Sequence, residues 1–205
     1  MTPYQYIKEK IILGEYKPNS IIDEKELSNI LNTSRTPIRE AILKLKEEGF
    51  ITIFPRKGTV VSTISFEDIK NLYQYRLILD SGIAAIASQS MKEEEIDFFI
   101  KDIEKTIDNN DIHSSISLDD DDKRFHMSLA NSTSNPYLIN EEEKVMNQCL
   151  RIRILSNKES SERYFSSLKE HLEILKAIKR RNKEESAVKM KEHLKNTING
   201  YSFLD

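Results

Sequence analysis

The sequence has little of what marks a secreted, membrane-spanning or cysteine-rich protein. Among 205 residues there is one cysteine, Cys149, which has no second cysteine in the chain with which to form a disulfide. The longest wholly apolar run, residues 83–87, is far shorter than the roughly 18 residues that a membrane-spanning helix needs. The first twenty residues show no signal-peptide pattern. These absences favour a protein of the reducing cytoplasm, with no membrane partner and no thiolate metal cluster.

Proline and glycine are scarce after residue 60. Four of the five prolines and three of the five glycines come before it, which predicts short, interrupted elements near the N-terminus. The remainder is rich in Glu, Lys, Ile and Leu and predicts long helices packed on one another. Net charge divides in the same place, with +2 on residues 1–64 and −5 on residues 65–205. The sequence therefore predicts a mostly α fold with two domains, residues 1–64 and residues 65–205.

Apolar spacing and capping residues predict three helices in the first domain. The first begins at Pro3 and ends at Gly14, where the helical repeat stops. The second begins after Asp23, which precedes Glu26 by three residues as in a capping box. The third begins after Ser34, whose hydroxyl can cap the free amides of the first turn. Because the turn between the second and third helices is short, together they predict a helix-turn-helix.

Two strand-like segments follow, residues 50–54 and residues 59–61, and predict a hairpin that would form a wing. Arg35, Thr36 and Arg39 lie on the first turns of the third helix, away from its apolar face, where side chains enter a major groove. Arginine can bond bidentately to guanine or clamp a phosphate.

Three further cations can neutralise backbone phosphates: Lys25 on the preceding helix, and Arg56 and Lys57 at the wing tip. The alternative is that each is an ordinary surface charge. Their joint placement at the helix start and the wing tip favours DNA binding, although the net charge of this domain is small.

The run of residues 34–41, followed by residues 48–51 and 58–61, resembles the winged helix-turn-helix of the GntR family of bacterial transcription regulators. The resemblance spans residues 4–64. It implies that Arg35 and Arg39 read operator bases, that Thr36 assists and Lys25 touches phosphate, and that the wing enters the minor groove. The residues predicted to contact DNA are Lys25, Ser34, Arg35, Thr36, Arg39, Arg56, Lys57 and Gly58.

The second domain is predicted to be an all-α antiparallel helical bundle. The predicted helices span residues 66–90, 92–109, 115–131, 136–157, 161–181 and 183–200. Polar residues interrupt three of the apolar faces. Asp122 and His126 lie one turn apart on the third of these helices, while His171 and His193 lie on inward faces of the fifth and sixth.

A buried carboxylate and buried imidazoles are costly unless they are paired, and a shared divalent metal ion would pair all four. The nitrogen and oxygen ligands suit zinc in the first place, and nickel or another transition metal as alternatives. The competing interpretation is that each histidine only bonds to a helix carbonyl. Three histidines and an inward aspartate together favour the metal, although spacing alone does not show that they converge.

Residues 122–126, with Asn135-Pro136, Glu170-His171 and residues 192–194, resemble the FCD ligand-binding domain of FadR-like regulators over about residues 67–201. The resemblance implies that the metal ligands are Asp122, His126, His171 and His193. It also implies that Arg76 holds a carboxylate effector beside the metal. Asp80 stands one turn after Arg76, where many members have glutamate.

Together these features predict a metal-containing, ligand-responsive DNA-binding transcription regulator. We expect a repressor that binds a palindromic operator as a homodimer and responds to a small organic acid, which would complete the metal's coordination and pair with Arg76. One alternative is a regulator that senses the metal itself. Another is a metal-dependent enzyme acting on a small carboxylate, since two histidines and a carboxylate also describe a non-haem iron site.

No general base is recognisable for such an enzyme. Glu170 and Glu192 each directly precede a histidine, so on a helix they should point roughly 100° away from it. Cys149 lies on an apolar stripe and should be a small core residue. Arg151 and Arg153 could line the effector cavity or bridge to a neighbouring helix, and the sequence does not choose between these roles.

Overall fold

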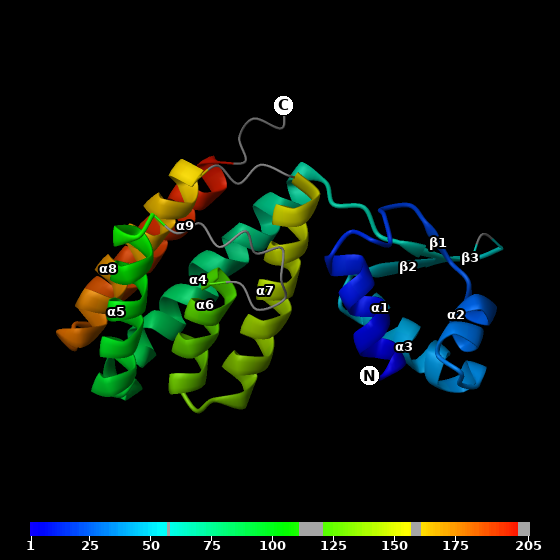
Figure 1. Cartoon of the computed structure of the whole chain (residues 1–205), viewed down its shortest axis with the longest axis horizontal. Coiled ribbons are helices and arrows are strands. Elements are labelled where there is room, and N and C mark those ends of the chain that lie inside the picture. Colours follow the sequence, from blue (N-terminus) through cyan, green and yellow to red (C-terminus); the bar gives the residue numbers. More distant parts are fainter. Residues whose placement is uncertain (57, 111–120, 157–160, 201–205) are drawn as a thin grey trace. The chain divides into compact units, whose positions relative to one another are not determined.

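A computed structural model of the chain describes residues 1–56, 58–110, 121–156 and 161–200 (Figure 1). Contacts divide the chain into two compact units. Unit 1 comprises Met1–Ser65 and Asn147–Asn157, and unit 2 comprises Phe66–Met146 and Lys158–Asp205. The predicted fold class is confirmed, since the described residues are mostly helical and include one small sheet. Across these ranges the structure contains no helix long and apolar enough to cross a membrane.

Unit 1 contains the three predicted helices. They are α1 (Pro3–Ile12), α2 (Glu24–Ile30) and α3 (Arg35–Glu47). Asp23 caps α2 by accepting hydrogen bonds from the backbone amides of Lys25 and Glu26, at 2.7 and 3.2 Å. Helix α1 packs on α3 through buried isoleucine and leucine side chains, so the apolar faces read from the sequence form one core. The buried residues include Ile7, Ile11, Ile38, Ile42 and Leu45.

Ser34 occupies the N-cap position of α3, but its side chain makes no capping hydrogen bond, so that detail of the prediction is wrong. An N-cap side chain normally accepts from the second or third amide of the helix. The third residue of α3 is Pro37, which has no backbone N–H to donate. The exposed hydroxyl of Ser34 therefore remains at the surface beside the start of α3.

The wing is a hairpin of β2 (Ile51–Phe54) and β3 (Gly58–Val61), close to the predicted segments. Its antiparallel register pairs Ile51 with Val61 and Phe54 with Gly58. A third strand, β1 (Ile21–Ile22), pairs with β3 on the other side and gives the order β1-β3-β2. This strand was not predicted, because two residues carry no periodic pattern that the sequence could reveal.

The last turns of α7 (Pro136–Ser156) belong to unit 1. Gln148 Nε2 donates to the backbone carbonyl of Glu48, the C-cap of α3, at 2.8 Å. Arg151 is buried and donates to the backbone carbonyl of Ser62, directly after β3. Burial lowers the pKa of Arg151 to about 10. The role that the sequence left open for Arg151 is thus a backbone contact at the base of the wing.

Unit 2 is built from helices that lie close to their predicted limits. They are α4 (Phe66–Ser90), α5 (Glu93–Asp108), α6 (Asp121–Ser132), the first part of α7, α8 (Ser161–Lys179) and α9 (Lys183–Asn199). The predicted start of the α6 helix at residue 115 lies outside the described residues. Helix α4 contacts α6, α8 and α9, and α8 lies beside α5 and α9 (Figure 1). Polar residues on the inner faces of these helices therefore meet in the interior of the bundle.

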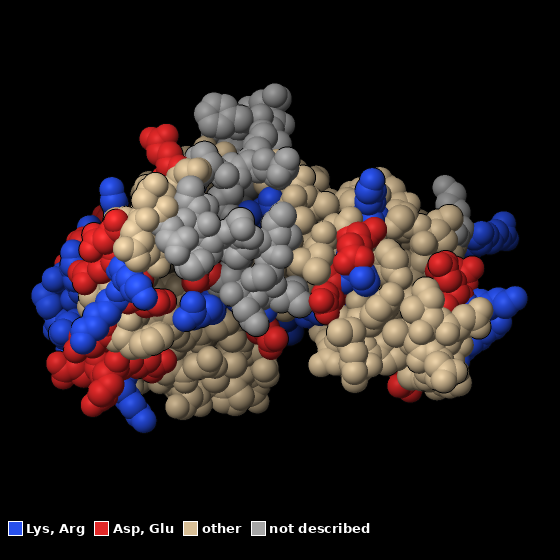
Figure 2. Space-filling model, viewed as in Figure 1, with Lys and Arg blue, Asp and Glu red and all other residues tan. Residues whose placement is uncertain are grey.

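The outer surface of unit 2 carries charges of both signs. Figure 2 shows Lys and Arg interspersed with Asp and Glu over the region of α5 and α8. Examples are the exposed ion pairs of Lys179 with Asp97 at 2.6 Å and of Lys176 with Glu173 at 2.8 Å. Such pairs contribute little to stability, because water screens them. The charged groups that call for a functional explanation are those inside the bundle.

Candidate metal centre and DNA-binding surface

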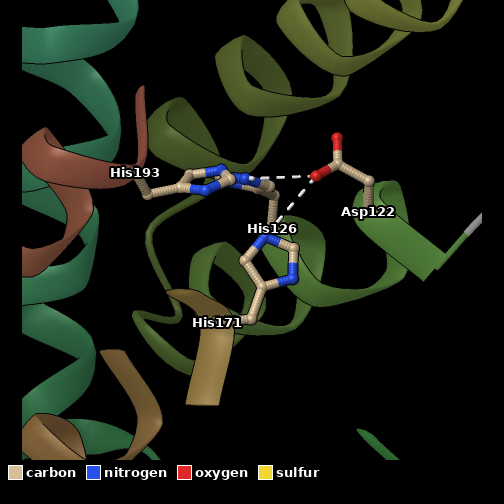
Figure 3. A group of neighbouring side chains, drawn as sticks. All are labelled: Asp122, His126, His171 and His193. Carbon is tan, nitrogen blue, oxygen red and sulfur yellow. Dashed lines mark ion pairs between the residues drawn. The ribbon is translucent and has the colours of Figure 1, made fainter. Parts of the chain in front are cut away.

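The structure brings together all four residues that the sequence predicts as metal ligands. Asp122 and His126 come from α6, His171 from α8 and His193 from α9, and Figure 3 shows them directed toward one another. One ligand atom from each lies within 4.8 Å of all the others. The three histidines are buried. Residues up to 71 positions apart thus converge on one point.

One histidine of the cluster, His171, has ring nitrogens without hydrogen-bond partners in the part of the chain that the structure describes. Asp122 Oδ1 lies 3.5 Å from His171 Nε2 and 3.8 Å from His126 Nε2. The longer distance exceeds hydrogen-bond length, and the shorter is at its limit. Neither ring nitrogen of His171 has a hydrogen-bond partner among the described residues, although the ring stacks on Phe125 with centroids 3.9 Å apart. Because orphaned buried acceptors are costly and this donor set suits zinc or nickel, the residues fit a divalent cation.

Burial also keeps two of the imidazoles, His126 and His171, in the neutral form that binds metal. It holds the pKa of His126 well below its usual range, and the positive charge of Arg76 lowers it further. Burial lowers the pKa of His171 to about 3, with the neighbouring His193 adding to the effect. At neutral pH a cation would therefore not have to displace protons from these two rings.

Arg76 lies directly beside the cluster, at the position that the sequence proposed for effector binding. On α4 it pairs with Asp80, one turn later, with Nε and Nη2 at 2.9 and 2.8 Å from Asp80 Oδ2. Its Nη2 also lies 3.2 Å from His126 Nε2. Both side chains are buried. Asp80, which stands where many FCD domains have glutamate, is thus the ion-pair partner of Arg76.

Glu142 is a buried acid of this region that sequence reasoning missed. It comes from α7, and its Oε1 lies 3.5 Å from His126 Nδ1, as does Oδ2 of Asp80. Burial raises the pKa of Glu142 well above its usual range, and the nearby charge of Asp80 raises it further. A signal was present in the sequence, since Glu142 shares a helical stripe with the buried Val145, Met146 and Cys149.

The sequence predicted that Glu170 points away from His171, the histidine that directly follows it, and so away from the site. The structure shows that Glu170 nevertheless contacts another histidine of the cluster, His193. Glu170 Oε2 lies 2.8 Å from His193 Nδ1, across the contact between α8 and α9. Burial alone would raise the pKa of Glu170. Hydrogen bonds from His193, Arg163 and Asn196 outweigh that effect and hold the pKa well below its usual range. The geometry of one helix places Glu170 away from His171, but it does not exclude contact with a second helix.

The predicted DNA contacts in the described residues lie on the surface of unit 1. Ser34, Arg35, Thr36 and Arg39 are exposed at the start of α3. Arg39 Nε donates to Glu24 Oε2 on α2 at 2.9 Å. The exposed set also includes Lys25 on α2, and Arg56 and Gly58 at the wing. Lys57 lies outside the described residues. A row of exposed donors at a helix N-terminus can approach phosphates and base edges.

Comparisons with known proteins agree with this architecture. Residues 3–61 match the model of the bacterial regulatory proteins of the gntR family, and residues 71–196 match the FCD domain. The HTH-type transcriptional regulator YdhC of Bacillus subtilis is 29% identical over 187 residues, covering 88% of this chain and 81% of that protein. The HTH-type transcriptional repressor RspR of Escherichia coli is 26% identical over 194 residues, covering 93% and 83%.

Solved structures show the same fold. The structure of Escherichia coli McbR/YncC has a TM-score of 0.77 at 18% identity and covers 99% of this chain and 97% of that chain. A GntR regulator from Rhodococcus has a TM-score of 0.72 at 18% identity, covering 98% and 96%. The family and these relatives are transcription regulators and not enzymes, which removes the enzymatic alternative. The chain therefore belongs to the GntR family of DNA-binding bacterial regulators, with an FCD domain as its second part.

Proposed function

We propose that this GntR-family protein is a metal-containing repressor of the FadR-like group, released from or directed to its operator by a small organic acid. The observation that carries the proposal is the buried cluster of Asp122, His126, His171 and His193, with Arg76 3.2 Å from His126. FCD domains can bind metals, and this chain has the ligand types to do so.

The four clustered residues would hold one divalent cation, zinc in the first place or nickel or another transition metal. When bound, such an ion supplies a localised positive charge with affinity for carboxylate oxygens. Asp122 brings one negative charge, whereas His126 and His171 are neutral at physiological pH. The three histidines and one carboxylate would leave the ion with net positive charge, which favours an anionic ligand.

Arg76 supports an acid as that ligand. Its guanidinium is buried beside the cluster, and Asp80 fixes its direction through two short contacts. A carboxylate would find the arginine and the cation on adjacent sides, and arginine binds carboxylates bidentately. The acid changes operator affinity only by binding more tightly to one arrangement of the protein than to another.

The proposed partner of unit 1 is a palindromic operator bound by a two-fold dimer. A stripe of exposed apolar side chains on α4 supports a second copy of the chain as the partner of unit 2. The stripe contains Tyr75, Ile78 and Ile86, and Ile78 is 77% exposed. Gly82 lies on the same face, and apart from its own chain neighbours and the nearby backbone of α4, no heavy atom of the described residues lies within 4 Å of the position that a Cβ would take. Self-association of this face would bury the stripe and create a two-fold axis.

The dimer is tested by sedimentation of the wild type and of Ile78→Glu. We expect the wild type to be a dimer. The Ile78→Glu dimer should dissociate at protein concentrations at least tenfold higher than the wild-type dimer does, because a buried charge in an apolar interface is costly. Lys101→Glu, on the exposed surface of α5, is the control for an added acid. A wild-type monomer, or an Ile78→Glu dimer of unchanged stability, contradicts this part of the proposal.

The ligand response is tested by elemental analysis and thermal shift with zinc, nickel and a panel of small carboxylates. DNA affinity is then measured on operator fragments that the protein selects from random-sequence DNA. We expect metal in the purified protein, a carboxylate that raises Tm only in metal-loaded protein, and a changed DNA affinity. Arg76→Met should keep the metal and lose the carboxylate response. If chelation alone changes operator affinity and no acid does, the protein senses the metal itself.

A further inference from the structure

We propose that Glu170 is a positioning residue for the metal site, which holds the His193 ring so that its Nε2 faces Asp122, His126 and His171. The inference rests on the metal site proposed above. Glu170 lies on α8, whereas the histidine that it positions lies on α9. The sequence alone predicted that Glu170 points away from the site.

The contact between Glu170 and His193 determines which nitrogen of the His193 ring carries the proton. Glu170 Oε2 lies 2.8 Å from His193 Nδ1, a strong charge-assisted hydrogen bond. A carboxylate accepts and cannot donate when ionised, so Nδ1 carries the proton and Nε2 keeps its lone pair. His193 is buried, and a ligand atom of its ring belongs to the four-residue cluster. Glu170 therefore selects the tautomer in which Nε2 is free to bind a cation.

Glu170 is itself held in place by several donors. Arg163 Nη1 lies 2.9 Å from Oε1 and Arg163 Nη2 lies 2.8 Å from Oε2, a bidentate pair on the same helix. Asn196 Nδ2 on α9 donates to Oε1 at 2.9 Å. Arg163 Nη2 also donates at 2.8 Å to Oγ1 of Thr197, one turn after His193. This network ties α8 to α9 at the level of the cluster, so the carboxylate has little freedom to turn away.

The chain contains its own control. Glu192 directly precedes His193, just as Glu170 directly precedes His171, so the same dipeptide occurs twice. Glu192 is exposed and pairs with Lys189 at 2.8 Å. The two glutamates therefore share sequence context and formal charge, but of the two, within the part of the chain that the structure describes, only Glu170 contacts a histidine of the cluster.

The experiment compares Glu170→Gln, Asn196→Ala and Glu192→Gln in the full chain. Zinc affinity is measured by competition with a chromophoric chelator, and the His193 tautomer by long-range ¹H–¹⁵N NMR of metal-free protein. We expect Glu170→Gln to weaken zinc binding by about 10- to 100-fold, the range found for such outer partners. Asn196→Ala should weaken it less, and Glu192→Gln should bind zinc as the wild type does. The Nδ1-protonated signature should be present in the wild type and reduced in Glu170→Gln.

Each outcome bears on one claim. Unchanged zinc affinity in Glu170→Gln, with a wild type that binds zinc, overturns the positioning role and leaves the metal site standing. Weaker binding in Glu170→Gln with an unaltered His193 tautomer also overturns it, because Glu170 would then act only through the fold. A wild type that binds no zinc, nickel or other divalent cation overturns the proposed function, and the positioning role with it.

Discussion

The two units each contain an arginine–carboxylate pair, and the pairs differ mainly in their exposure to water. In unit 1, Arg39 lies 2.9 Å from Glu24, with 64% and 31% of the side chains exposed. In unit 2, Arg76 lies 2.8 Å from Asp80, with 2% and 1% exposed. Water screens the first pair, so a phosphate can replace Glu24 at little cost. The second pair is buried, so loss of either member would leave a buried charge without its partner. Each side chain therefore holds the other in place.

This difference suits the two kinds of ligand proposed above, DNA for unit 1 and a metal ion for unit 2. DNA is large and arrives from solvent, so the side chains that contact it must remain exposed and mobile until it binds. A metal ion is small, and its ligands must be held close together before it binds. In the proposed metal site, His171 would carry the cost of that preorganisation, because its buried ring nitrogens lack hydrogen-bond partners among the described residues. Four predictions test this contrast.

Removal of one cluster histidine should have the largest effect. His171→Ala deletes one of four ligands, and we expect zinc affinity to fall by on the order of a thousandfold or more, measured by chelator competition. Lys169→Ala, exposed on the same helix, should bind zinc normally. Similar zinc affinity in His171→Ala and the wild type would show that the buried cluster is not the binding site.

Removal of an exposed arginine of unit 1 should have a smaller effect, and on affinity for DNA instead of zinc. Arg35→Ala should weaken binding to the selected operator about 10- to 100-fold and relax base preference at one position, because a bidentate contact contributes roughly 1–3 kcal/mol of discrimination. Zinc affinity should not change. Fluorescence anisotropy measures the first quantity, with Lys101→Ala on α5 as control. An Arg35→Ala protein that keeps both affinity and base preference would remove Arg35 from the DNA surface.

The stability of the metal-free protein should fall as the pH is lowered. The pKa of His171 is about 3 in the folded protein, below the value of about 6.5 in the unfolded chain, so the unfolded chain takes up the proton first. The contribution of His171 is fully present above pH 6.5 and is lost as the pH falls toward 3, by about 2 kcal/mol at pH 5.

Urea unfolding at pH 7.5 and pH 5 measures that loss. His171→Leu is the reference, since it retains the other titrating groups, such as Glu142, whose raised pKa acts in the opposite direction. The wild type should lose more stability than His171→Leu over this interval. Equal losses in the two proteins would show that His171 is not held neutral by burial.

The smallest effect should come from Glu24. Glu24→Ala frees Arg39 and removes one negative charge near the DNA surface, so operator affinity should rise by about two- to fivefold at low salt and less at high salt. Glu47→Ala, exposed at the other end of α3, controls for the loss of an acid in general. A weaker operator complex in Glu24→Ala would mean that the pair orients Arg39 for binding and does not compete with DNA.

Features that depend on local sequence were predictable. The limits of α4, Phe66–Ser90, match the predicted helix because its apolar repeat has clear ends. The inward direction of His126, His171 and His193 followed from the same periodicity, and all three are buried. A local rule failed at Ser34, where Pro37 removes one of the amides that a cap would bind.

Features that depend on which helices touch were not predictable from periodicity. Glu170 meets His193, and Glu142 approaches His126, only because of how α8, α9, α6 and α7 pack. A helical repeat says which face is inward, but it does not say which residue of another helix lies opposite. Periodicity supplied the four candidate ligands, and the resemblance to a family supplied the role of Arg76, whereas the contacts of Glu142 and Glu170 with the histidines required coordinates.

Anomalous diffraction at the zinc edge, from crystals of the full chain grown with zinc, would show where the ion binds. We expect one peak per chain, about 2.0–2.2 Å from a nitrogen of each of the three histidines and from an Asp122 oxygen. A peak at any other place in zinc-loaded protein, with the space between these four side chains empty, would contradict it.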